Sequence, residues 1–173
     1  MRIITPYLFA ALIASADATV PPMWNRAFGD RSQAVWNRLN EDGAVTASEI
    51  IEENYKEGSH HDGDRQLATA FVLITCDSDP IPALEQMMQE KTPERRAFAA
   101  LTAGLIGDTR SEADLQRLRG DKTGLGQFPG DWFWDTVGDA AEQALKNFKD
   151  RSLVKLLEEE KIRPGVWLQR TPK

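Results

Sequence analysis

The chain has 173 residues, of which 41% are hydrophobic and five are tryptophan. This length and apolar content suit one folded domain with its own core and exclude a disordered chain. The 21 basic and 27 acidic residues give a net charge of −6. That charge argues against nucleic acid or an anionic membrane as the main partner, because both favour basic surfaces. The single cysteine, Cys76, excludes a disulfide within the chain and is expected to be a small buried residue.

Residues 1–18 have the pattern of an export signal. Arg2 precedes an apolar run at 7–14, and the small residues at 14–18 offer an A-x-A cleavage site. The run is too short to span a bilayer, so we expect no membrane insertion of the mature chain. The sequence thus predicts a signal peptide at 1–18, a single helical domain at 19–173 and a periplasmic or secreted protein. A cytoplasmic protein, whose first residues form an ordinary helix packed on the domain, is the alternative.

Apolar residues recur at helical spacing through most of the remaining chain. Asp30 is a candidate cap for a first helix, and Thr46 with Glu49 forms a capping box for a second that stops at Gly58. Two further helices follow, the second of them starting at Asp79. Their expected apolar faces contain Ile50, Ile51 and Tyr55, then Leu67, Ala68, Phe71, Val72 and Thr75, then Leu84, Met87 and Met88.

The helix over 92–108 has the clearest signals. Thr92 can cap it with its hydroxyl, Pro93 suits the first helical position, and Gly107 supplies a stop. One apolar stripe is expected, made of Ala97, Phe98, Ala100, Leu101, Gly104 and Leu105. Because several of these residues are small, neighbouring helices are expected to approach closely.

Beyond this helix, the sequence predicts a short helix from Ser111 to Gly120 and a glycine-rich loop over 120–134. Helix resumes at Asp135, with an apolar stripe that continues to Phe148. Asp150 is a candidate cap for a last helix, and Trp167 is expected to fold back onto the core.

A faint internal repeat runs through the chain. Matches at a spacing of 31 include Ala68 with Ala99, Leu84 with Leu115 and Met87 with Leu118, and matches at 34 and 41 occur before and after them. The stretches ERRAFAALTAGLIGD at 94–108 and VGDAAEQALKNF at 137–148 resemble the second helix of short HEAT-like repeats, as in phycobilisome lyase-type repeat proteins. The resemblance implies an all-α fold of stacked antiparallel helical hairpins, a short α-solenoid whose concave face binds proteins. An irregular helical bundle is the alternative.

The aromatic part of the loop is the most unusual stretch of the sequence. Insertions in stacked repeats often form the binding surface, and tryptophan is a frequent interface anchor. The predicted partner-binding residues are therefore Phe128, Asp131, Trp132, Phe133 and Trp134. In the alternative, the two tryptophans fold back and cover the core.

A second loop carries His60 and His61 with Asp62 and Asp64, which are weak candidate metal ligands. Adjacent histidines lack the i, i+4 spacing of a helical zinc pair, so a solvated loop is the favoured interpretation. We accordingly expect no catalytic residue, no metal and no cofactor.

These observations favour a monomeric, non-enzymatic protein–protein interaction module, a scaffold or adaptor. It would bind an unidentified protein through its concave face and the loop at 124–134. Three alternatives remain: a periplasmic immunity-type inhibitor that covers the basic active site of a toxin enzyme, a glycan-binding surface at Trp132 and Trp134, and a weakly metal-dependent enzyme at His60 and His61.

Overall fold

A computed structural model describes residues 46–56, 63–76, 78–126, 134–150, 152–159 and Trp167. Their elements are α4 (Ala47–Lys56), α5 (Gly63–Thr75), α6 (Ile81–Met87), α7 (Pro93–Ile106), the 3-10 turn η3 (Thr109–Ser111), α8 (Glu112–Leu118), α9 (Val137–Asp150) and α10 (Ser152–Glu159). Over these ranges the chain is all-α, as predicted, and its only extended pairing is an isolated bridge between Gly124 and Thr136. None of the helices described is long and apolar enough to cross a membrane. The segment 1–18 and the helix expected after Asp30 lie outside the described residues.

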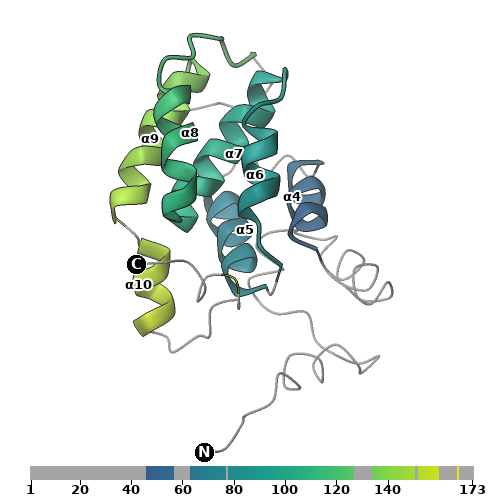
Figure 1. Cartoon of the computed structure of the whole chain (residues 1–173), viewed down its shortest axis with the longest axis vertical. Coiled ribbons are helices and arrows are strands. Elements are labelled where there is room, and N and C mark those ends of the chain that lie inside the picture. The colour runs from purple at the N-terminus through teal and green to yellow at the C-terminus, as the bar shows by residue number, and fades with distance from the viewer. Residues whose placement is uncertain are drawn as a thin grey trace, which may run out of the picture.

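The central helix is α7. It packs on α5, α6, α8, α9 and α10, and its most extensive contact is with α9. Figure 1 shows it in the middle of the helices, with α9 towards one edge and α4 at the other. Every residue from 97 to 104 is buried, whereas Leu105 is only partly buried. The prediction of a single apolar stripe was therefore wrong, because neighbours surround α7 on several sides and bury it all round.

The ends of α7 match the prediction in two of three details. Pro93 is the first helical residue, and Gly107 ends the helix in the left-handed conformation (φ 71°), donating to the Ala103 carbonyl at 2.9 Å. The hydroxyl of Thr92 makes no capping bond, so that prediction was wrong. The turn before the helix is instead held by Arg96, whose Nη1 donates to the backbone carbonyls of Glu90 and Lys91, each at 2.9 Å.

Capping boxes start both α4 and α9. At α4, the backbone N–H of Thr46 donates to Glu49 Oε2 at 3.0 Å and the N–H of Glu49 donates back to Thr46 Oγ1 at 3.3 Å, as predicted. The same reciprocal pair joins Thr136 and Asp139, at 3.0 and 3.2 Å. Helix α9 thus begins at Val137 behind Thr136, slightly later than the start expected at Asp135.

Small residues allow very close helix contacts, as predicted. A Cβ atom on Gly104 would lie 2.4 Å from the carbonyl oxygen and 2.6 Å from the Cα of Ala144, so the backbones of α7 and α9 touch there. A Cβ atom on Gly138 would lie 2.8 Å from the carbonyl oxygen of Arg119, at the end of α8. Glycine at these two positions therefore fixes how α9 lies against its neighbours.

Several predicted core positions are confirmed, whereas others are only partly buried or exposed. Leu84, Met87, Met88 and the α9 residues Val137, Ala140, Ala141, Ala144 and Leu145 are buried, and Trp167 returns to the core with 5% of its surface exposed. Leu67 is 39% exposed, because α5 packs on both α4 and α7 and turns a different set of residues inward, including Gln66 and Thr69. Cys76 is only partly buried, and its Sγ donates to the carbonyls of Leu73 and Ser78 at 3.1 and 3.2 Å.

The Gly104 contact generates a stability prediction. Gly104→Ala places a methyl group inside the backbone of α9, so the free energy of unfolding should fall by about 1–3 kcal/mol. Urea unfolding followed by helical circular dichroism measures this change. Gly120→Ala is the matched control, since its Cβ would lie 3.8 Å from the nearest atom, the Arg117 carbonyl oxygen. Equal stability of the two variants would contradict the close α7–α9 contact.

Candidate functional site

We call residues 124–134 the aromatic loop. Its two described ends are fixed to each other. Gly124 and Thr136 form the antiparallel bridge. Beside it, the Leu125 N–H donates to the Asp135 carbonyl and the Val137 N–H donates to the Thr123 carbonyl, both at 3.0 Å. The two described ends of the loop therefore meet at one point, between the end of α8 and the start of α9.

The same loop ends pack against α7 and α9. Leu125 and Trp134, both partly buried, pack against a small cluster of buried residues made of Ala97, Leu101 and Ala140. We call the surface formed by these three residues the loop-covered face. A hydrogen bond from the Gly126 N–H to Glu94 Oε1, at 3.1 Å, ties the loop to the first turn of α7. The base of the loop is thus held by apolar contacts, by backbone pairing and by one side-chain bond.

Of the five predicted partner-binding residues, the structure describes Trp134. Its contacts with the loop-covered face show that it covers small core residues, as the alternative interpretation expected of the tryptophans. A direct role of Trp134 in binding a partner stays a prediction. Phe128, Asp131, Trp132 and Phe133 lie outside the described residues.

The weak metal candidates are also largely outside the described chain. His60, His61 and Asp62 are not described, and of Asp64 the structure describes the backbone in the first turn of α5. Among the side chains that are described, no group of three or more His, Cys, Asp and Glu is placed to hold a metal ion.

A cluster of charged residues that the sequence analysis did not identify lies around Arg95, in the first turn of α7. Its Nη1 and Nη2 donate to the two carboxylate oxygens of Glu52 on α4, the first bond at 3.0 Å. Its Nε and Nη2 donate to the two oxygens of Glu90, which follows α6, the second bond at 3.1 Å. The hydrogen bonds of Arg95 to Glu52 and to Glu90 raise the pKa of its guanidinium, while burial opposes this increase. One permanently charged guanidinium on α7 therefore links α4 to the residues that follow α6.

Tyr55 packs beside this ion-pair cluster. The Arg95 guanidinium carbon lies 4.9 Å from the centre of the Tyr55 ring, within cation–π range, and Tyr55 meets Phe98 edge-on with ring centres 5.5 Å apart. Burial raises the pKa of the Tyr55 phenol, and the positive charge of Arg95 opposes that increase.

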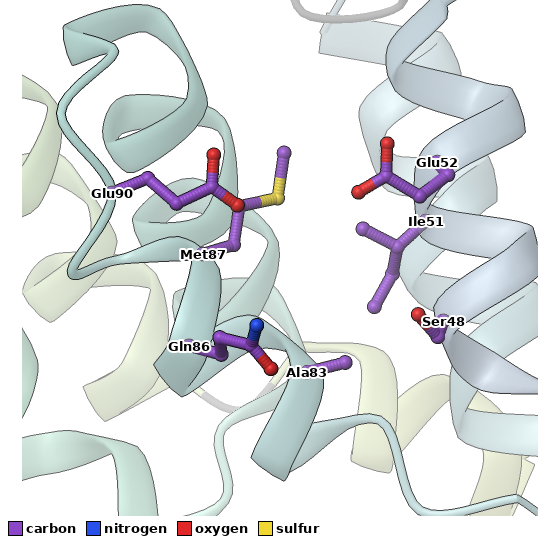
Figure 2. Close-up of a pocket in the computed structure, with 7 residues that line it drawn as sticks. All are labelled: Ser48, Ile51, Glu52, Ala83, Gln86, Met87 and Glu90. Carbon is purple, nitrogen blue, oxygen red and sulfur yellow. The ribbon is translucent and has the colours of Figure 1, made fainter.

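A small pocket lies between α4 and α6, next to the same carboxylates. Its volume is about 60 Å³, and its lining consists of Ser48, Ile51, Glu52, Ala83, Gln86, Met87 and Glu90. Figure 2 shows Glu52 and Glu90 extending into the gap from opposite sides, with the side chains of Ile51 and Met87 between them. We call this the α4–α6 pocket. Pockets that hold whole small molecules are typically about 300 Å³ or larger, so this one suits only the end of a longer group.

Sequence reasoning missed the Arg95 cluster because its members are far apart in the chain. Arg95 lies 43 residues from Glu52, and its separation of five from Glu90 is not a helical neighbour spacing. Only the packing of α4, α6 and α7 brings the three side chains together.

No family model, no curated protein and no solved structure gives a significant match to the chain. The resemblance to short HEAT-like repeats therefore remains a prediction made from the residues.

The buried phenol of Tyr55 predicts a measurable pH effect. In a Tyr7→Phe variant, Tyr55 is the only tyrosine, so phenolate absorbance reports on it alone. Its titration in the folded chain should have a midpoint above the ordinary value of 10.0 and above that of the urea-unfolded chain. The unfolded chain then loses its proton first, so Tyr55 leaves stability unchanged below pH 10.0 and lowers it as the pH rises through the folded pKa. An additional Arg95→Met change should raise the folded midpoint further; a folded midpoint at or below the unfolded one would contradict the described burial.

Proposed function

We propose that the chain is a non-enzymatic protein-interaction module of stacked HEAT-like hairpins, which binds a protein partner through its concave face and the aromatic loop at 124–134. The anchoring of the aromatic loop carries this proposal, because the Gly124–Thr136 bridge and Trp134 hold both ends of the loop on α7 and α9. A loop fixed at its base loses less conformational freedom when a partner binds. Aromatic side chains then contribute large contact area, since tryptophan and tyrosine dominate many interfaces.

The contacts between helices support the hairpin part of the proposal. Helices α5, α7 and α9 pack on one another in succession, and α4 contacts α6. The Ala47 N–H donates to Ser78 Oγ at 3.0 Å, and Arg110 Nη1 donates to Asp79 Oδ2 at 2.6 Å. Both pairs are 31 residues apart, the spacing of the faint sequence repeat. In a stack of repeats, equivalent positions of successive units are one repeat length apart. The two residues joined by each of these bonds have that separation.

Charge and the N-terminal pattern define the proposal further. The pattern at 1–18 favours a periplasmic or secreted module. The net charge of −6 favours a partner with a basic surface, since complementary charge speeds encounter and selects partners. A basic toxin enzyme is one partner of this kind, so an inhibitor is the second candidate function.

A pull-down with matched variants tests the binding module. The full chain, tagged at its C-terminus, should retain a protein from native extract, and Trp132→Ala should lose most of it while helical circular dichroism and unfolding stay unchanged. Trp132 is preferred to Trp134, whose removal would uncover the loop-covered face. Leu67→Ala is the control, because it removes an exposed apolar side chain from α5 and should keep the partner. Equal retention by Trp132→Ala would move the site away from the loop, and no retained protein would count against the binding module itself.

A further inference from the structure

One stripe of α5 stays accessible although the rest of the helix is buried. Leu67, Phe71 and Thr75 are spaced by four residues and therefore lie on one side of the helix. From 66 to 75 they are the only side chains that are not buried. Leu67, at 39%, is the one large apolar side chain among the described residues that is exposed. We call these three residues the α5 stripe.

The equivalent side of α7 is covered by the hairpin that precedes it. The two helices α5 and α7 end 31 residues apart, which is the spacing of the faint repeat. At that spacing the α5 stripe corresponds to Phe98, Thr102 and Ile106, which have no exposed surface. The ring of Phe98 meets that of Tyr55 on α4, with centres 5.5 Å apart, and its carbonyl accepts from Gln66 Nε2 on α5 at 3.3 Å. This side of α7 therefore faces the α4–α5 unit.

We propose that the α5 stripe is covered in the same way by residues 31–41 of this chain, which lie outside the described residues. The stack then has one more unit before α4, and the apolar side of α5 is closed by the protein itself. The inference rests on the stacked-hairpin part of the proposed function and is independent of its partner-binding part.

The position of α4 in the chain agrees with this arrangement. Helix α5 ends at Thr75, and α6 begins at Ile81. Thirty-four residues earlier, these two points fall at residue 41 and at Ala47, where α4 begins. The connection from residue 41 to α4 is then as long as the connection from α5 to α6. Residues 31–41 thus occupy the place of the second helix of a hairpin, as α5 does.

The residue pattern of 31–41 suits the α5 stripe. Val35 and Leu39 are one helical turn apart and would place apolar surface on one side of this segment. Ala34 and Leu39 also match residues of α5 at the spacing of 34. As a helix, residues 31–41 would be about 16 Å long, enough to cover the roughly 12 Å between residues 67 and 75, since each residue adds about 1.5 Å.

A nitroxide label on residues 31–41 of the full chain tests this contact. The label is attached through Asn37→Cys, on the side of the segment away from Val35 and Leu39, and Cys76→Ser leaves it a single attachment site. The labelled chain carries ¹⁵N and is diluted with isotopically unlabelled, label-free chains, so broadening reports contacts within one molecule. Backbone amide signals of the α5 stripe should lose most of their intensity. Amides of α9, which α7 separates from α5, should keep theirs.

Two variants separate a specific contact from general proximity. Leu67→Asp places a charge on the α5 stripe, and because a buried unpaired charge is costly, it should restore most of the Phe71 signal. Amide shifts of α7 and α9 should stay unchanged and so report an intact fold. Ala113→Asp is the matched control, because it adds the same charge at an exposed position of α8 and should leave the broadening as it was.

A mixed sample tests a second copy of the chain as the occupant. In it, ¹⁵N chains without nitroxide are combined with isotopically unlabelled chains that carry the nitroxide, and Phe71 should not broaden. Three results would overturn the inference: undisturbed α5 amides in the diluted sample, equal broadening in the mixed sample, or unchanged broadening in a folded Leu67→Asp variant.

The two proposals fail separately. A chain that retains a protein partner in the pull-down but shows no broadening on α5 has the proposed binding function without the additional unit. A chain that shows the broadening but retains no partner has the additional unit without the proposed binding function.

Discussion

The backbones of α7 and α9 touch where Gly104 faces Ala144, and the remaining packing depends on this contact. A single methyl group has no room there, so the distance between the two helices is set by the absence of a side chain. At this separation Ala97, Leu101 and Ala140 meet in one small cluster. Leu125 and Trp134 can then lie across both helices, and the aromatic loop acquires a fixed base.

The first turn of α7 connects this core to the aromatic loop and to the α4–α6 pocket. Glu94 accepts the hydrogen bond from Gly126 at the loop, while Arg95 holds Glu52 and Glu90 at the α4–α6 pocket. Arg96 binds Asp121 in the segment after α8, with Nη2 and Oδ2 2.9 Å apart. Glu94 and Arg96 therefore bind the segment after α8, and Arg95 between them binds α4 and the residues after α6. Such different directions are possible because successive residues of a helix point about 100° apart. Since buried α7 positions this turn, the loop and the pocket both depend on the central helix.

Features that depend on a few neighbouring residues were predictable from the sequence, and those that depend on packing were not. The Thr46 capping box, Pro93 and Gly107 follow from local backbone chemistry, and each lies where it was expected. The exposure of Leu67 depends on which faces of α5 its neighbours cover, so helical periodicity alone predicted it wrongly. The composition of the aromatic loop made it noticeable in the sequence. The packing of Trp134 against two helices could not be predicted, because it depends on how α7 and α9 lie in the fold. Arg95 and Glu52 become neighbours only when α4 and α7 pack in the same domain.

Native-state hydrogen exchange tests the central role of α7 most directly. Amides in the middle of α7, around Ala99–Ala103, and those facing them in α9, around Ala141–Leu145, should exchange only through global unfolding and be the slowest of the chain. Amides of α4 and α10, at the two ends of the described helices, should exchange through smaller openings of lower free energy. If the amides of α7 exchange as fast as those of α4 or α10, the account of a domain organised around the α7–α9 contact is wrong.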